Sequence, residues 1–296
     1  MIKTKAIGPE RRVTFETKCY ENDWPYILKG SYLSEMIERC DYPFAKKRVV
    51  INNVKNRALV ERYARKKVRQ GIIDEYVFAE DSEASVLDGF GLSRESFGSG
   101  YKYSISELVG IICCDTEYLL HFASDTFMER SRCNRMKPLH WIDASINLLE
   151  SDRTILTANP LWNKAFSEAE SEAEETFPDY WRGYGFSDQC YLIRAKDFLG
   201  DIYGDANPAS DRYPAYGGNL FEKRIDSYMR NNRLSRITFK EPSYIHANFP
   251  KGPLLKFLQT LVTMIPGLRF VTIFRDNMKM GKLLRLMKRL VRPLRD

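Results

Sequence analysis

The stretch Glu117-Tyr118-Leu119-Leu120-His121-Phe122-Ala123-Ser124-Asp125-Thr126 decides the fold of this 296-residue chain. Its apolar part, Tyr118 to Phe122, predicts a short buried strand, which runs out into small polar residues and one carboxylate. In an open α/β sheet, ligands gather beyond the carboxyl ends of the strands. Asp125 therefore stands where a metal ion bound to a phosphate group could be held.

Strand and helix signals alternate on both sides of this stretch. Strands are predicted over residues 12–19, 48–52, 75–79 and 154–158, the last ending in Asn159-Pro160. Helical spacing of apolar residues is present over 24–40, 57–70, 104–114 and 141–150. Such alternation predicts an α/β fold with a mostly parallel central sheet and helices on both faces.

The composition is that of a globular protein with a large core. Hydrophobic residues make up 44% of the chain and charged residues 29%. None of the six cysteines forms a C-x-x-C pair, which favours reduced thiols in a cytosolic protein. The N-terminus lacks the apolar run of a signal peptide, and this argues against secretion.

The positive charge is concentrated at the C-terminus. Residues 279–296 contain seven basic residues and one acid, a net charge of +6 out of +7 for the whole chain. The preceding 278 residues therefore carry only +1. A nearly neutral body argues against a nucleic-acid-binding face, which requires basic residues spread over the folded surface.

The same C-terminal segment predicts a basic amphipathic helix. Its apolar residues fall at helical spacing: Leu283, Leu286, Met287, Leu290 and Leu294. A helix of this kind can lie on an anionic membrane surface, or it can dock on the body or on a second subunit. Concentrated charge favours the membrane surface. We thus predict a domain over residues 1–250 and a membrane-associating helical tail over 251–296, located in the cytoplasm on the inner face of the cell membrane.

The order of the motifs resembles that of a GT-A fold glycosyltransferase, with most similarity to the inverting glycosyltransferase family two. A first strand ends in Cys19-Tyr20-Glu21, and the third ends in Glu80-Asp81-Ser82, where the family commonly has Asp-Asp-Gly-Ser. Ala123-Ser124-Asp125 falls on the family's Asp-x-Asp motif and lacks its first Asp.

The resemblance continues through the second half and covers roughly residues 11 to 248. Phe186-Ser187-Asp188-Gln189-Cys190-Tyr191-Leu192-Ile193 is similar to the acceptor-side strand of related sugar transferases. Gly217-Gly218-Asn219-Leu220-Phe221-Glu222 leads into a helix where the family places its catalytic carboxylate. Ile245-His246-Ala247 resembles the family's late histidine.

The resemblance implies a Rossmann-like nucleotide-binding site for a UDP-, GDP- or dTDP-sugar. The residues it assigns to the nucleotide are Cys19, Tyr20, Glu21, Glu80, Asp81, Ser124 and Asp125. It further implies that the tips of neighbouring strands bring Asp81 and Asp125 together around the pyrophosphate. Asp125 and His246 would hold Mn²⁺ or Mg²⁺, with diphosphate and water as further ligands. Because Ala123 replaces one carboxylate, metal binding is expected to be weak, or basic side chains would stabilise the leaving diphosphate without a metal.

Two carboxylates compete for the role of general base. Glu222 opens a predicted helix after a Gly-Gly pair, a position from which it can face the acceptor. Its structural alternative is an N-terminal glutamate stabilised by the helix dipole. Asp188 is the second candidate, with a structural alternative as a hydrogen-bonding residue at a strand end.

The function expected from these residues is sugar transfer, with inversion, from a nucleotide donor to a glycan or lipid-linked acceptor. A basic membrane-associating tail fits bacterial surface-polysaccharide assembly. One alternative is a sugar-nucleotide nucleotidyltransferase, although the chain lacks a Gly-rich basic loop after its first strand. The other is a catalytically degenerate, membrane-bound binding or scaffold subunit, which the loss of the first Asp would favour.

Overall fold

The computed structural model describes residues 13–129, 140–213 and 218–246. Its strands are β1 (Val13–Cys19), β2 (Lys46–Ile51), β3 (Glu75–Phe78), β4 (Tyr118–Phe122), β5 (Thr126–Met128), β6 (Ile155–Trp162), β7 (Ala173–Thr176), β8 (Tyr180–Gly183), β9 (Cys190–Arg194) and β10 (Ser235–His246). Its α-helices are α1 (Trp24–Lys29), α2 (Tyr32–Glu38), α3 (Arg57–Arg69), α4 (Ala79–Gly89), α5 (Arg94–Phe97), α6 (Tyr101–Ile112), α7 (Trp141–Ser151), α8 (Phe166–Ser171) and α9 (Phe221–Asn231). Short 3₁₀ turns are η1 (Gly98–Gly100), η2 (Ala195–Phe198) and η3 (Pro208–Arg212).

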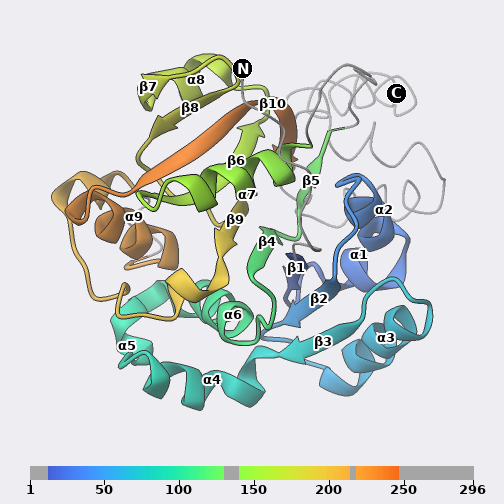
Figure 1. The fold of residues 1–296 in the computed structure, drawn as a ribbon. Coiled ribbons are helices and arrows are strands. Elements are labelled where there is room, and N and C mark those ends of the chain that lie inside the picture. The colour runs from blue at the N-terminus through green and yellow to red at the C-terminus, as the bar shows by residue number, and fades with distance from the viewer. Residues whose placement is uncertain (1–12, 130–139, 214–217, 247–296) are drawn as a thin grey trace, which may run out of the picture.

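One sheet runs through the molecule in the order β3-β2-β1-β4-β9-β6-β10-β8-β7, and β5 pairs with β10 (Figure 1). The strands β3, β2, β1 and β4 are mutually parallel, and β6 is parallel to β10. Between these two groups lies β9, which is antiparallel to both β4 and β6. From β3 to β10 the sheet is therefore mostly parallel with one reversed strand, and the predicted α/β fold is confirmed.

Helices cover both faces of the sheet. In β4, Leu120 packs in a core with the apolar residues of α1, α2, α3 and α7, and its neighbour Leu119 packs in a second core with α4, α5, α6 and α9. Both leucines are fully buried. A strand that is apolar on both faces reads as a continuous run, which explains why the sequence shows no alternation there. Figure 1 shows α6 and α3 on opposite sides of the strands that they flank.

Two predicted elements differ from those observed. The helix expected over 24–40 is two helices, because the chain turns at Gly30, whose backbone is extended after α1. The strand expected to end at Asn159-Pro160 continues to Trp162. Proline cannot donate to the ladder and is found at irregularities. Here the register of β10 jumps from Phe239 to Ser243 opposite Pro160 and Leu161, which accommodates it.

Helix α6 approaches β1 closely at Gly110. The carboxylate of Glu16, fully buried in β1, occupies the space where a Cβ on residue 110 would lie. Arg48 of β2 donates through Nη2 to the Gly110 carbonyl at 2.5 Å and to Glu16 at 2.6 Å. A glycine at this position therefore lets a buried ion pair fit between the helix and the sheet.

The predicted tail, residues 251–296, lies outside the described residues, so its helical and membrane-associating character stays a prediction. Within the described ranges, none of the helices has the length and apolar character needed to cross a membrane.

Candidate active site

A pocket of about 470 Å³ opens where β1, β2 and β4 end. The reversed strand β9 also begins at this edge, since the Ala123 amide after β4 donates to the Gln189 carbonyl before β9 at 2.9 Å. Loops after parallel strands are the usual ligand site of an open α/β sheet. The lining residues are Lys18, Cys19, Tyr20, Glu21, Asn22, Asp23, Asn52, Asn53, Lys55, Ser99, Lys102, Tyr103, Ser106 and Ser124.

The pocket combines cations with aromatic rings. Lys18, Lys55 and Lys102 all lie on its wall. Tyr20 and Tyr103 are among the few large apolar side chains that are exposed in the described chain, at 38% and 55%. Lysines suit a phosphate-bearing ligand, and exposed rings offer faces on which a nucleobase can stack. Of the residues assigned to the nucleotide from the sequence, Cys19, Tyr20, Glu21 and Ser124 line this pocket.

Asp23 is a buried carboxylate on the pocket wall that sequence reasoning missed. It accepts hydrogen bonds from the Ser124 hydroxyl and the Tyr20 amide, both at 2.5 Å. Burial raises the pKa of Asp23 to about 7, although both hydrogen bonds oppose the rise. In sequence, an Asp before Trp24-Pro25 indicates an ordinary helix N-cap, but its side chain makes no capping bond to α1. Only the fold shows that it joins the loops after β1 and β4.

Asp125 and His246, the two predicted metal ligands, lie together. The antiparallel pairing of β10 with β5 sets His246 opposite Thr126, and His246 Nε2 is 3.4 Å from Asp125 Oδ1. Burial lowers the pKa of His246, but the hydrogen bond and charge of Asp125 outweigh it and raise the pKa overall.

One carboxylate and one imidazole suit Mn²⁺ or Mg²⁺ only where other ligands complete the coordination sphere. Across residues 13–129, 140–213 and 218–246, no three His, Cys, Asp or Glu side chains gather to hold a metal. Asp125 and His246 could therefore hold a cation only together with ligands from outside these two side chains.

Asp188 and Glu222, the two candidate bases, are also adjacent. The Asp188 amide donates to Glu222 Oε2 at 3.4 Å, and Lys18 Nζ lies 3.6 Å from Asp188 Oδ2. Glu222 lies in the first turn of α9, as predicted, and the start of this helix is fixed by a bond from the Phe221 amide to Ser104 of α6. Burial, followed by the charge of Asp188, raises the pKa of Glu222 to about 8. Glu222 is therefore mostly protonated at neutral pH.

Glu80 and Asp81 are not among the residues that line this pocket. Both residues belong to the first turn of α4, and Asp81 forms an exposed ion pair with Arg57, with a hydrogen bond of 2.6 Å. Glu80 accepts from the Asn53 amide at 2.5 Å and so contacts a residue of the lining.

Asp81 and Asp125 were expected to follow neighbouring strands. This expectation is wrong, because Asp81 follows β3 and Asp125 follows β4, and these strands are not adjacent. Two strands, β2 and β1, lie between β3 and β4. At roughly 4.8 Å a step, three steps separate the two tips by about 14 Å.

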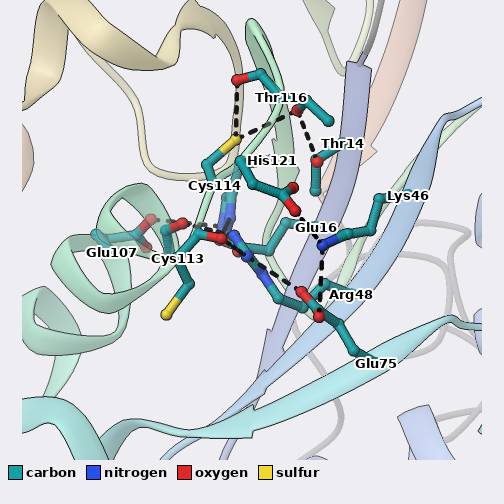
Figure 2. A network of polar contacts seen from close by, with 12 residues as sticks. Thr14, Glu16, Lys46, Arg48, Glu75, Glu107, Cys113, Cys114, Thr116 and His121 are labelled. Carbon is teal, nitrogen blue, oxygen red and sulfur yellow. Dashed lines mark hydrogen bonds and ion pairs between the residues drawn. The ribbon is translucent and has the colours of Figure 1, made fainter.

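Behind the pocket, a buried polar network joins the sheet to α6 (Figure 2). Glu16 accepts from Arg48 and lies 3.3 Å from His121 Nδ1, and all three side chains are almost fully buried. Glu107 of α6 accepts from the Tyr191 hydroxyl at 2.7 Å and pairs with Lys18. Burial lowers the pKa of His121, so this histidine is part of the buried core in its neutral form.

Comparisons with known proteins give structural likenesses only. No protein-family model and no curated protein matches the sequence. Among solved structures, the galactosyltransferase LgtC with donor and acceptor sugar analogues matches at 13% identity and a TM-score of 0.41, over 76% of this chain and 72% of that one. Glucosyl-3-phosphoglycerate synthase from Mycobacterium tuberculosis with Mg²⁺ and UDP matches at 12% identity and a TM-score of 0.43, over 90% and 81%.

GalNAc-T7 with UDP, GalNAc and Mn²⁺ matches at 12% identity and a TM-score of 0.47. The match spans 79% of this chain but only 43% of that protein. All three structures are glycosyltransferases, the class that the sequence resemblance indicates. Since the three TM-scores are below 0.5, the function proposed below rests on the geometry of this chain.

Proposed function

We propose that this chain is a GT-A-type glycosyltransferase that moves a sugar, with inversion, from a nucleotide donor to an acceptor hydroxyl. One observation carries the proposal. A lysine- and tyrosine-lined pocket, the Asp125–His246 pair and the Asp188–Glu222 pair all lie at the edge where β4 ends and β9 begins. Sugar transfer needs these three components together: an anion site, a means of stabilising the leaving diphosphate, and a base.

The pocket would hold the nucleoside diphosphate. Lys55 and Lys102 would bind phosphate oxygens, and Tyr20 and Tyr103 would contact the base. Asp125 and His246 would hold a divalent cation, which supplies positive charge against the charge that develops on the leaving diphosphate. Asp125 and His246 contact each other at 3.4 Å, so one ion could reach both donor atoms.

Asp188 is the better candidate for the base. Inversion requires the acceptor hydroxyl to lose its proton as it attacks the anomeric carbon opposite the leaving group. With a pKa of about 8, Glu222 holds a proton at neutral pH and cannot accept another. The partly exposed Asp188 has Lys18 3.6 Å away as a counterion for its charged form. We therefore assign proton removal to Asp188 and assign Glu222 to its support.

The proposal is tested by measuring binding and turnover separately. Ligands that bind the native state raise its melting temperature, so a thermal-shift screen would compare UDP-, GDP- and dTDP-sugars with and without Mn²⁺. We expect one series to shift the melting temperature and to be hydrolysed slowly to the free sugar. Asp125→Ala should remove the Mn²⁺-dependent part of the shift, and Glu129→Gln, at an exposed ion pair with Lys164, is the matched control.

Three outcomes would decide against transfer. Binding without any hydrolysis or transfer would favour the scaffold alternative, and release of pyrophosphate from a nucleoside triphosphate and a sugar phosphate would favour a nucleotidyltransferase. Absence of binding by every nucleotide sugar would overturn the proposal.

The acceptor and the location are proposed from the sequence alone. A glycan or lipid-linked acceptor, and a role in surface-polysaccharide assembly at the inner face of the membrane, follow from the basic segment 279–296. Deleting residues 279–296 should release the protein from vesicles that contain anionic lipid while nucleotide binding persists. Vesicle binding by the truncated chain would contradict a role for this tail.

A further inference from the structure

Lys18 occupies a position that touches both the pocket and the candidate base. It belongs to β1, lines the pocket, and has a side chain that is only 17% exposed. Its ammonium group pairs with Glu107 of α6, which is 1% exposed, and lies 3.6 Å from Asp188 Oδ2. Lys18 therefore lies between Glu107, the Asp188–Glu222 pair and the pocket.

The buried network leaves Lys18 as the counterion of Glu107. Arg48 is committed to Glu16 and to backbone carbonyls of α6. His121 Nε2 is 3.7 Å from Glu107 Oε2, but burial lowers the pKa of this histidine, which therefore stays neutral near pH 7. The Tyr191 hydroxyl donates to Glu107 without contributing charge.

The charges that face Asp188 and Glu222 come from several elements. Besides Lys18, Arg212 of η3 acts on Glu222, but it is also engaged by Glu172 at 3.2 Å and by the buried Asp226 of α9 at 3.7 Å. The buried Tyr213 is affected by the charge of Glu222, and the buried Tyr191 and Tyr244 by that of Asp188. The charge of Asp188 also acts on two histidines, His121 of β4 and His246 of β10. Of the cations named here, Lys18 is the one that also lines the pocket.

We propose that Lys18 is a positioning residue that couples the pocket to the proton held by Glu222 beside Asp188, so that an anionic nucleotide in the pocket makes this pair bind a proton more tightly. The inference rests on the proposed function, because it takes the pocket to be the nucleotide site. A diphosphate adds negative charge near the pair and draws the ammonium group of Lys18 toward itself. Both changes favour the protonated form of the carboxylates.

Reciprocity makes this coupling measurable as proton uptake on binding. We expect the protein to take up protons when it binds UDP, GDP or dTDP at pH 8, because burial and the charge of Asp188 raise the pKa of Glu222 to about 8. Calorimetric titration in two buffers of different ionisation enthalpy counts these protons. Affinity should also fall as the pH rises above 8, by at most about tenfold per pH unit for one linked proton.

The variants separate Lys18 from the other pocket lysines. Lys18→Met alone leaves Glu107 buried without a counterion, so the informative variant is the double change Lys18→Met/Glu107→Gln, which removes both charges and keeps a partner for Tyr191. We expect proton uptake at pH 8 to fall clearly in this variant, which keeps only the direct effect of the diphosphate charge, and to vanish in Glu222→Gln. Lys102→Met is the matched control, and it should weaken nucleotide binding but retain the proton uptake.

The outcomes distinguish this inference from the proposed function. Nucleotide binding without proton uptake in the unaltered protein, or uptake that is undiminished in Lys18→Met/Glu107→Gln, overturns the role of Lys18 and leaves the proposed function standing. If none of the three nucleotides binds, both fail. A loss of uptake in Lys102→Met would show that pocket charge in general, rather than Lys18, carries the coupling, and would also overturn the inference.

Discussion

The two edges of the central sheet carry pockets of similar size but different chemistry. At the edge opposite the candidate active site, a larger pocket of about 570 Å³ is lined by residues 114–118, Glu150, Arg153, Arg194 and the start of η2. Several of its polar groups form hydrogen bonds that hold neighbouring elements together. Arg194 bonds Asp197 and the carbonyls of Leu149 and Ile155, and the Tyr118 hydroxyl donates to Glu150 at 3.0 Å.

At the active-site edge, several polar groups have shifted pKa values or share a partner. Asp23 and Glu222 are buried carboxyl groups with raised pKa values, and Lys18 is shared between two acids. Titratable groups with perturbed pKa values that converge on a pocket are typical of functional sites. The comparison shows that the state of the polar groups, more than cavity volume, identifies the candidate site.

The largest expected effect comes from Asp188→Asn. Because this change removes the proposed base and preserves shape, we expect transfer or donor hydrolysis to slow by about 10²- to 10⁴-fold. Nucleotide binding, measured by thermal shift, should persist and show that the variant is folded. Asp115→Asn at the opposite edge is the control with an unchanged rate, and a wild-type rate in Asp188→Asn would remove this residue from the chemistry.

A second effect concerns the dependence of stability on pH. The pKa of Glu222 rises from 4.5 to about 8 on folding, so above pH 4.5 the unfolded chain releases a proton that the native state retains. Stability is therefore lost as the pH rises toward 8, by up to about 1.4 kcal/mol per pH unit. Glu222→Gln should remove this loss, so its melting temperature should exceed that of the wild type increasingly from pH 5 to pH 8.

The matched control for this pH series is the exposed Glu174→Gln, which should follow the wild type at every pH. Parallel melting curves for Glu222→Gln and the wild type over the whole range would mean that burial does not perturb Glu222.

A third, smaller effect tests the pocket lysines. Lys55→Ala and Lys102→Ala each remove a proposed phosphate contact, worth about 1.5 kcal/mol or roughly tenfold in Kd. Lys196→Ala, on the wall of the opposite pocket, should leave the Kd unchanged. If Lys196→Ala weakened nucleotide binding as much as Lys102→Ala, the ligand would belong to the other edge.

The smallest effect is expected from the ion pair of Lys46 and Asp115, which join at 2.6 Å beside the opposite pocket. Their partly exposed side chains are screened by water, so Lys46→Met should change the free energy of unfolding by at most about 1 kcal/mol. Chemical denaturation checks this value. A much larger loss of unfolding free energy would indicate that the ion pair stabilises the fold more than its exposure suggests.

Local patterns predicted the elements of the first half well. The strand Tyr118–Phe122 has the predicted bounds, and the helix expected over 57–70 is observed as Arg57–Arg69, with the Asn56 side chain accepting from the Leu59 amide as its N-cap. Such features depend on apolar spacing and capping chemistry, which neighbouring residues carry.

Features set by strand order could not be predicted in the same way. The resemblance implied that Asp81 and Asp125 follow neighbouring strands, whereas β1 pairs with both β2 and β4 and so lies between them. The buried state of Asp23 likewise depends on Ser124, 101 residues away. In contrast, His246 was placed beside Asp125 through the family resemblance, and the pairing of β10 with β5 explains their contact.

The close contact between Gly110 and the Glu16 carboxylate links positions that are far apart in the chain. Any side chain at 110 would have to displace an acid that Arg48 neutralises, and losing the acid would leave that guanidinium buried without its partner. Positions 16, 48 and 110 should consequently be replaced together during evolution. Homologues that carry alanine at 110 should have exchanged the acid and the arginine for uncharged residues.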